Sequence, residues 1–206
     1  MSGQFRIQTE HLGKKFGHHW IFKNLNIEFK TGEHTAIIGP NGSGKSTLLQ
    51  IIARTEAATI GNISYMLNNT SIPTEHLYKY ISIAAPYIDL IEEFTLSECV
   101  KFHFKFKKSR AGISFAEFIS DVLDMKKDSA KTIKFFSSGM KQKLKLALAL
   151  YSDTPVLLLD EPTTNLDQNN IQWYRDEIEK CANNKLIIVC SNIPHEYFFC
   201  SHIVNL

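Results

Sequence analysis

A run of small and basic residues at positions 39–47, GPNGSGKST, matches the phosphate-loop pattern G-x-x-x-x-G-K-[ST]. Its glycines let the backbone curl so that successive N–H groups point inward, where they can hold phosphate oxygens. Lys45 is expected to reach the β- and γ-phosphates of a nucleotide, and the Ser46 hydroxyl is expected to ligate Mg²⁺. The residues predicted to bind the nucleotide here are Gly39, Pro40, Asn41, Gly42, Ser43, Gly44, Lys45, Ser46 and Thr47.

Two adjacent carboxylates, Asp160 and Glu161, follow the apolar run at 156–159. The carboxyl ends of strands in an open parallel sheet face the ligand crevice, so both acids are expected beside the phosphate loop. Asp160 is then predicted to hold the Mg²⁺ shell, and Glu161 to polarise the attacking water as a general base, with Lys45 as the second catalytic residue. The alternative, in which the acids only cap a turn, is disfavoured by the phosphate loop upstream.

The elements that must position these residues follow from the apolar patterning of the chain. The strand Thr35–Ile38 runs directly into Gly39, and residues 46–53 have helical character with no breaker. Continuous apolar strands separated by helices indicate a parallel sheet that is covered on both faces. Further strands are predicted at 62–66, Ile81–Ala84, 156–159 and Leu186–Cys190.

The opening and the middle of the chain differ from this pattern. Short alternating runs at 5–9 and 25–29, separated by a polar loop that contains glycine, predict a small antiparallel sheet. Residues 95–134 have a pattern typical of helices. They are more polar than the predicted core strands and contain no strong strand signal. One domain over 1–206 is therefore expected, with a nucleotide-binding core at about 1–86 and 148–206 and a helical subdomain at about 87–147.

The bulk composition disfavours several classes of protein. The 206 residues suffice for one well-buried domain, and a net charge of +2 lacks the strongly basic balance expected of a nucleic-acid binder. The four cysteines form no CxxC pair and are interpreted as reduced packing thiols. No apolar run approaches the ~18 residues that a membrane-spanning helix needs.

The stretch 136–167, FSSGMKQKLKLALALYSDTPVLLLDEPTTNLD, resembles the ATP-binding cassette (ABC) family, in which an LSGGQ signature precedes the Walker B strand and a D-loop. Ser137 and Gly139 match the signature, whereas Ser138 and Met140 depart from it. The local residues leave two alternatives open, because Ser137 can cap the following helix or the helix N-terminus can bind an anion. The resemblance implies the second, with the signature touching ATP held by the opposite cassette of a dimer.

The same resemblance assigns two further positions. Residues 164–167, TNLD, resemble the D-loop that communicates across the cassette dimer, which gives Asp167 its predicted place. Phe16 matches the aromatic residue that stacks on adenine in the family. Both assignments rest on the resemblance alone.

Two positions depart from the family pattern. The family's glutamine after the strand Ile81–Ala84 falls on Pro86, which has no side-chain oxygen, and neighbouring Tyr87 is no better a match. The family's switch histidine is replaced by Asn192, which can hydrogen-bond a γ-phosphate but carries no charge. A register shift that brings in His195 is the alternative. These departures concern the rate of hydrolysis and its coupling, not nucleotide binding.

The resemblance implies an α/β P-loop NTPase core with a mainly parallel sheet flanked by helices, an N-terminal antiparallel β-subdomain and an inserted helical subdomain. It implies a Mg²⁺-dependent ATPase that energises transport through a separate transmembrane permease subunit. The driving step would be ATP-driven dimerisation of two cassettes, as a homodimer or a heterodimer. The expected location is cytoplasmic, peripheral on the cytoplasmic face of the cell membrane. The basic and aromatic run at 101–108 is interpreted as a surface of the helical subdomain, whose aromatic residues can serve the contact with that subunit.

Two other functions are weighed against this one. A soluble cassette acting on nucleic acid or ribosomes is disfavoured, because only about ninety residues separate Lys45 from Ser137 and they contain no heptads. A binding-only regulatory cassette with impaired hydrolysis is suggested by Pro86 and Asn192. Hydrolysis is still expected, because the lysine, the serine and both carboxylates of the core are present.

Overall fold

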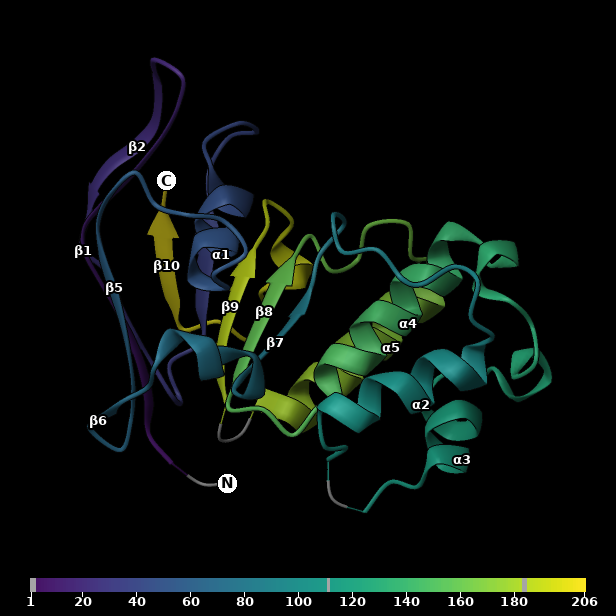
Figure 1. Ribbon diagram of the computed structural model, residues 1–206. Helices are drawn as coiled ribbons and strands as arrows, with labels where there is room; N and C mark the ends of the chain where they lie inside the picture. Colours follow the sequence, from purple (N-terminus) through teal and green to yellow (C-terminus); the bar gives the residue numbers. More distant parts are fainter. Residues whose placement is uncertain (1–2, 111, 183–184) are drawn as a thin grey trace.

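The computed structural model describes residues 3–110, 112–182 and 185–206. Figure 1 shows three parts side by side: an antiparallel sheet of mainly N-terminal residues, a parallel sheet at the centre, and a group of helices beyond it. Helix α1 (Lys45–Ile52) packs between the two sheets. This arrangement confirms the predicted α/β fold with an antiparallel β-subdomain and an inserted helical part.

Strand β1 is the central strand of the antiparallel sheet and is longer than predicted. β1 (Phe5–Phe16) pairs with β2 (His19–Leu25), β3 (Glu28–Lys30) and β5 (Ile60–Leu67), and β5 pairs with β6 (Thr70–Ser71). The predicted polar loop between the first two runs is therefore wrong for most of its length, and Phe16 ends a strand. The run at 25–29 is not one strand either, because residues 26–27 separate β2 from β3. Backbone pairing with β2 and β5 keeps these polar residues extended, although their side chains lack apolar alternation.

The parallel sheet has the strand order β10-β4-β9-β8-β7. Strands β4 (Thr35–Ile38), β7 (Ile81–Ala84) and β9 (Leu186–Cys190) match the prediction to the residue, and β8 (Val156–Asp160) is one residue longer. The prediction missed the edge strand β10 (His202–Asn205), whose residues are mostly exposed and therefore form no apolar run.

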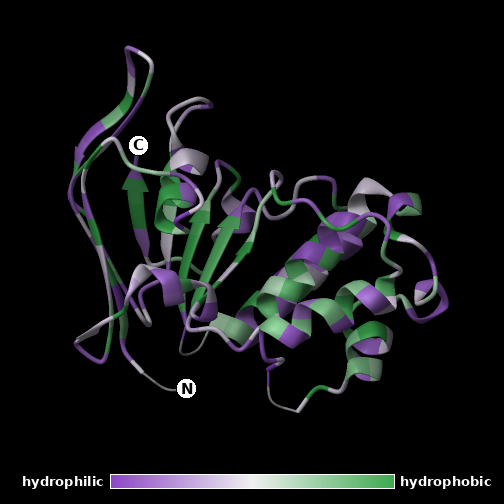
Figure 2. Cartoon of the chain, viewed as in Figure 1, coloured by the Kyte–Doolittle hydropathy of each residue, from purple (hydrophilic) through white to green (hydrophobic). Residues whose placement is uncertain are grey.

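The side chains of β8 alternate between two hydrophobic cores, one on each face of the parallel sheet. Leu157 and Leu159 pack among the helices, whereas Val156 and Leu158 pack with α1 and the antiparallel sheet. All four side chains are fully buried. Figure 2 shows the central strands as a continuous hydrophobic band. Cover on both faces explains why these strands appear as uninterrupted apolar runs.

The helical part is built from three long helices and a single turn. These are α2 (Leu96–Phe106), α4 (Ser138–Leu150), α5 (Gln168–Ala182) and the turn α3 (Phe115–Glu117). The predicted border of the helical subdomain, near residue 147, falls inside α4. The division of the domain into a core and a helical subdomain stays a prediction. Shorter helical turns span Thr74–Lys79, Phe118–Val122, Lys126–Asp128, Ile133–Phe135 and Pro194–Glu196. Within the described ranges, no helix combines the length and the apolar character needed to cross a bilayer.

Candidate active site

The strand order brings three segments of the chain to one edge of the parallel sheet. β9 lies between β4 and β8, so Ile37, Cys190 and Asp160 form a row across three strands. Beyond this row, β4 leads into the phosphate loop, β9 leads toward Asn192, and β8 leads into Glu161. The carboxyl ends of the strands therefore converge as predicted.

Two glycines of the phosphate loop are required by their surroundings. Gly44 has a φ of +101°, and a Cβ atom there would lie 2.3 Å from Ile21 Cγ2 of β2. Gly39 has a φ of +155°, and a Cβ atom there would lie 2.5 Å from the carbonyl oxygen of Leu206. Residues with a Cβ atom rarely adopt such angles, and neither neighbour leaves room for one. Contacts from distant parts of the chain therefore shape the loop.

Lys45 lies buried at the start of α1, where its ammonium group donates to two carbonyl oxygens of its own loop. The Nζ atom is 2.7 Å from the Gly39 oxygen and 3.2 Å from the Pro40 oxygen. A phosphate in the loop would offer Nζ an anionic acceptor in place of neutral carbonyls. Charge-assisted hydrogen bonds are the stronger kind, so Lys45 is well placed to change partners when a nucleotide binds.

Glu161 and the phosphate loop line one open cavity of about 380 Å³. The Glu161 N–H donates to the Cys190 oxygen at 2.9 Å, and a φ of +43° turns the chain sharply after β8. A residue other than glycine persists at positive φ only where its surroundings hold it, and such residues cluster at functional sites. The residues that line the cavity are Ile21, Asn41, Gly42, Gly44, Lys45, Ser46, Thr47 and Glu161.

Asp160 is a buried carboxylate with one oxygen that makes no hydrogen bond to the described residues. Its side chain is 2% exposed, and its Oδ1 atom has no hydrogen-bond partner among the described residues. Burial raises the pKa of Asp160 to about 6, although a hydrogen bond from Ser46 and the charge of Lys45 act in the opposite direction. A buried carboxylate oxygen beside a hydroxyl suits Mg²⁺, which prefers oxygen ligands and keeps several waters. Ser46 and Asp160 therefore fit the predicted metal ligands.

Asn192 lies directly against the phosphate loop. Its Oδ1 atom accepts from the Gly39 N–H at 3.2 Å, and its Nδ2 atom is 3.5 Å from Asn41 Oδ1. His195, the alternative in a shifted register, instead has its Nε2 atom 3.2 Å from Thr163 Oγ1. The contacts of these residues favour Asn192 over His195 for a role beside the γ-phosphate.

A buried polar network ties the segment after β9 to the segment after Glu161. Glu196 is fully buried, and its Oε1 atom accepts from both the N–H, at 2.7 Å, and the hydroxyl of Thr163. Because the Thr163 hydroxyl donates to the carboxylate, His195 must donate its Nε2 proton to Thr163 Oγ1. No local sequence pattern predicted this network, because its members come from separate segments.

The turn after β7 carries the first departure from the family pattern. Pro86 is exposed there and offers no side-chain oxygen, as predicted. Tyr87 lies closer to the site than the sequence indicated. Burial and the Asp160 carboxylate both raise the pKa of Tyr87, whereas a hydrogen bond with Gln50 of α1 lowers it. The charge of the buried carboxylate therefore acts on the phenol group, a coupling that only the fold reveals.

The signature residues line a second cavity, of about 650 Å³. Ser137 caps α4 by accepting from the Met140 N–H at 3.2 Å, which confirms the local capping interpretation. A Cβ atom on Gly139 would lie 2.9 Å from the Asn165 oxygen, so this glycine lets α4 approach the D-loop closely. Among the described residues, this cavity and the phosphate-loop cavity share no member. Its lining includes Ser137, Ser138, Gly139, Met140, Lys143, Asn165, Asp167 and Trp173.

Two residues assigned by resemblance have local roles of their own. Asp167 Oδ1 accepts from the Asn170 N–H at 2.8 Å at the start of α5. Phe16 ends β1 and is 51% exposed, with the Lys14 ammonium 4.6 Å from its ring centroid. Phe16 is not among the described residues that line the phosphate-loop cavity. The D-loop and adenine roles of these residues stay predictions.

Comparison with known proteins identifies the family. The model of the family described as ABC transporter matches residues 22–164, which is more than half of the chain. The chain belongs to the ABC transporter family. The resemblance noted for the signature and Walker B segments is therefore confirmed over most of this ABC cassette.

Individual members of the family match this ABC chain over almost its full length. It is 28% identical to the probable ABC transporter ATP-binding protein PEB1C of Campylobacter jejuni, over 97% of this chain and 84% of that protein. It is 30% identical to the iron(3+)-hydroxamate import ATP-binding protein FhuC of Bacillus subtilis, over 97% of this chain and 78% of that protein. The dimeric structure of the bacterial ABC transporter cassette MJ0796 has a TM-score of 0.81 at 26% identity, covering 97% of this chain and 94% of that one.

The comparisons also bear on activity. A dimeric post-hydrolysis state of the same MJ0796 cassette, bound to ADP and Pi, matches with a TM-score of 0.81 at 25% identity. This ABC family chain is an ATP-binding and ATP-hydrolysing subunit of a transporter, as predicted. Neither the soluble cassette acting on nucleic acid or ribosomes nor the binding-only cassette is favoured.

Proposed function

We propose that ATP is hydrolysed in the cavity between the phosphate loop and Glu161, and that closure of two cassettes around ATP moves a separate transmembrane subunit. One observation carries the proposal: Lys45, Asp160 and Glu161 meet at the same edge of the sheet although more than a hundred residues separate the lysine from the acids. The direct test is Mg²⁺-dependent release of phosphate from ATP by the purified chain. ATP binding without any release would contradict the proposal.

The residues divide the chemistry between them. The phosphate loop holds the triphosphate through its N–H groups, and Lys45 leaves its loop carbonyls to neutralise the β- and γ-phosphates. Glu161 lines the same cavity and accepts a proton from the attacking water as general base. Ser46 and Asp160 would hold Mg²⁺, which when bound supplies positive charge beside the phosphate oxygens. The unpartnered Oδ1 atom of Asp160 supports this assignment.

The separation of the two cavities supports a dimer. The signature residues cannot complete the phosphate-loop cavity of their own chain if the two cavities share no lining. A second cassette would bring its signature and its Asp167 to this ATP, as the family resemblance implies. A ligand that binds the closed dimer better than the open one shifts the population toward closure.

Changing Asn192 to His is expected to raise ATP turnover several-fold. Asn192 reaches the phosphate loop through Gly39 and Asn41, so its side chain is at the right place but carries no charge. An imidazolium could make a charge-assisted hydrogen bond to the γ-phosphate, which is about twice as strong as a neutral one. Phosphate release at saturating ATP measures the change.

The matched control for this substitution is Asn62→His, on an exposed position of β5 far along the antiparallel sheet. Asn192→Ala should lower turnover, because it removes the contact altogether. An unchanged rate in both Asn192 variants would show that this residue does not act on the γ-phosphate.

We propose that the transmembrane subunit docks in an apolar groove at the helical part of the cassette. The groove encloses about 320 Å³ beside α2 and is lined by Phe94, Phe102 and Phe106, among other residues. The three rings form a chain of edge-to-face contacts, with centroids 5.5 and 5.0 Å apart. Exposed aromatic rings of this kind mark interaction sites. A partner there would hold the chain at the cytoplasmic face of the membrane as a peripheral protein.

Phe106→Asp is expected to reduce binding to native membranes about tenfold and to leave ATP turnover of the isolated chain unchanged. The Phe106 side chain is 64% exposed, so its replacement removes partner contact rather than core packing. Co-sedimentation with membrane vesicles measures binding, and liposomes of the extracted lipids separate a protein partner from the lipid surface. Tyr78→Asp is the control, because Tyr78 is 56% exposed and lies outside the groove. Equal losses in both variants, or strong binding to the liposomes, would contradict the docking proposal.

A further inference from the structure

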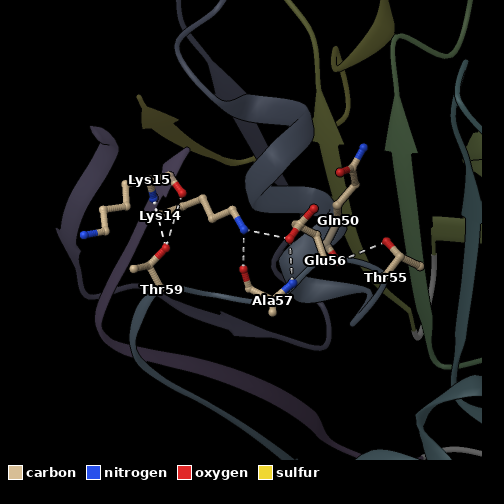
Figure 3. Close-up of polar contacts among 7 residues, drawn as sticks. All are labelled: Lys14, Lys15, Gln50, Thr55, Glu56, Ala57 and Thr59. Carbon is tan, nitrogen blue, oxygen red and sulfur yellow. Dashed lines mark hydrogen bonds and ion pairs between the residues drawn. The ribbon is translucent and has the colours of Figure 1, made fainter. Parts of the chain in front are cut away.

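Lys14 is a buried lysine whose ammonium group is held from several directions. The residue is 7% exposed, and its Nζ atom is 2.7 Å from Glu56 Oε1 and 2.7 Å from the Ala57 carbonyl oxygen. The same Nζ atom lies 4.6 Å from the ring centroid of Phe16. Figure 3 shows Lys14 directed toward Glu56 and Ala57, whereas neighbouring Lys15 extends the other way.

Glu56 connects this lysine to the helix that follows the phosphate loop. Its Oε1 atom also accepts from the Ala57 N–H at 3.0 Å, and its own N–H donates to the Gln50 oxygen of α1 at 3.3 Å. The hydrogen bond from Lys14 lowers the pKa of Glu56, and the Ala57 N–H acts in the same direction, so the carboxylate stays charged. The ion pair and the Glu56 N–H bond to Gln50 together link β1, which carries Phe16, to α1, which begins with Lys45.

The Phe16 ring is held by this ammonium on one side and is half exposed. Lys14 and Phe16 are two residues apart in β1, so their side chains emerge from the same face of the strand. A cation against one face of an aromatic ring fixes the ring and draws its π-electrons toward that face. The exposed remainder of the ring is then suited to stack on an electron-rich base.

We propose that Lys14 is a positioning residue for the nucleotide base, which it serves by fixing Phe16 through the ion pair with Glu56. The inference rests on the proposed binding of ATP in the phosphate-loop cavity and on the adenine-stacking role that the family resemblance gives to Phe16. It adds that base recognition depends on an ion pair outside the nucleotide cavity. A purely structural role of the pair would instead affect every ligand of the phosphate loop equally.

The test compares the affinities for ATP and for inorganic tripolyphosphate, which lacks a base, by titration calorimetry in the presence of Mg²⁺. Lys14→Met is expected to weaken ATP binding about fivefold and to leave tripolyphosphate binding unchanged. Lys14→Arg should retain most of the ATP affinity, because it keeps the charge. Lys15→Met is the matched control: its ammonium lies over Trp20 at 5.5 Å, and its contacts with Thr59 come from its backbone. It should alter neither affinity.

Glu56→Gln gives a second variant of similar size, should Lys14→Met unfold. It is expected to weaken ATP binding less than Lys14→Met does and to spare tripolyphosphate. Equal losses for both ligands, or an unchanged ATP affinity in the Lys14 variant, would overturn the inference. Phe16→Ala separates the two levels of the proposal. If it leaves ATP affinity intact, the stacking role and the inference fail together; if it lowers ATP affinity and Lys14→Met does not, only the inference fails.

Discussion

Replacing Glu161 by Gln is expected to slow ATP turnover by about a hundredfold to ten-thousandfold, the usual contribution of a general base. Gln has nearly the same size as Glu but cannot accept the proton of the attacking water. The backbone at this position should not change, because the turn at φ +43° and the bond from Glu161 N–H to the Cys190 oxygen do not involve the carboxylate. The Thr164 hydroxyl, 3.4 Å from Glu161 Oε2, can donate to an amide oxygen equally well.

Phosphate release and ATP affinity must be measured on the same preparation of the Glu161→Gln variant. ATP affinity should stay within about twofold of the unmodified chain, because the phosphate loop and Asp160 remain. Glu93→Gln, on an exposed residue away from the cavity, is the matched control and should have no effect. Turnover that survives the Glu161 change would show that another group activates the water. Proton transfer to Glu161 would then not limit the rate of ATP turnover.

Replacing Lys45 by Ala is expected to weaken ATP binding by at least about a hundredfold. Each hydrogen bond to a charged group contributes ~1.5–3 kcal/mol, and Lys45 is placed to make more than one to the β- and γ-phosphates. The buried Nζ atom now bonds the Gly39 and Pro40 carbonyl oxygens, so its loss also removes the contacts that hold the loop in shape. The first effect acts on the bound state. The second leaves the free loop less ordered, so that binding must order it, and both effects reduce affinity.

Calorimetric titration with ATP and Mg²⁺ measures the effect of the Lys45 change, and thermal unfolding shows whether the fold survives. Lys79→Ala, at an exposed lysine of the turn Thr74–Lys79, controls for the loss of one positive charge. Tight ATP binding by the Lys45→Ala variant would mean that the backbone N–H groups alone hold the triphosphate. The role of Lys45 in binding the β- and γ-phosphates would then have to be withdrawn.

The sequence alone predicted those features that depend on residues close together in the chain. The phosphate loop is one continuous run with its glycines, lysine and serine at set spacing, and the strand before it is apolar because both faces of the sheet are covered. Asp160 and Glu161 follow a second strand of the same kind. For this reason the family, the fold class and the core strands could be predicted.

Tertiary structure decided which distant segments meet at the site. β9 lies between β4 and β8, which places Asn192 on the phosphate loop and His195 on Thr163. Backbone pairing with β5 as far as Gly13 and with β2 as far as Phe16, not side-chain pattern, extends β1. Contacts between residues far apart in the chain leave no periodic mark on the sequence. For the same reason, the sequence did not reveal the effect of Asp160 on Tyr87, nor the ion pair of Lys14 with Glu56, forty-two positions further on.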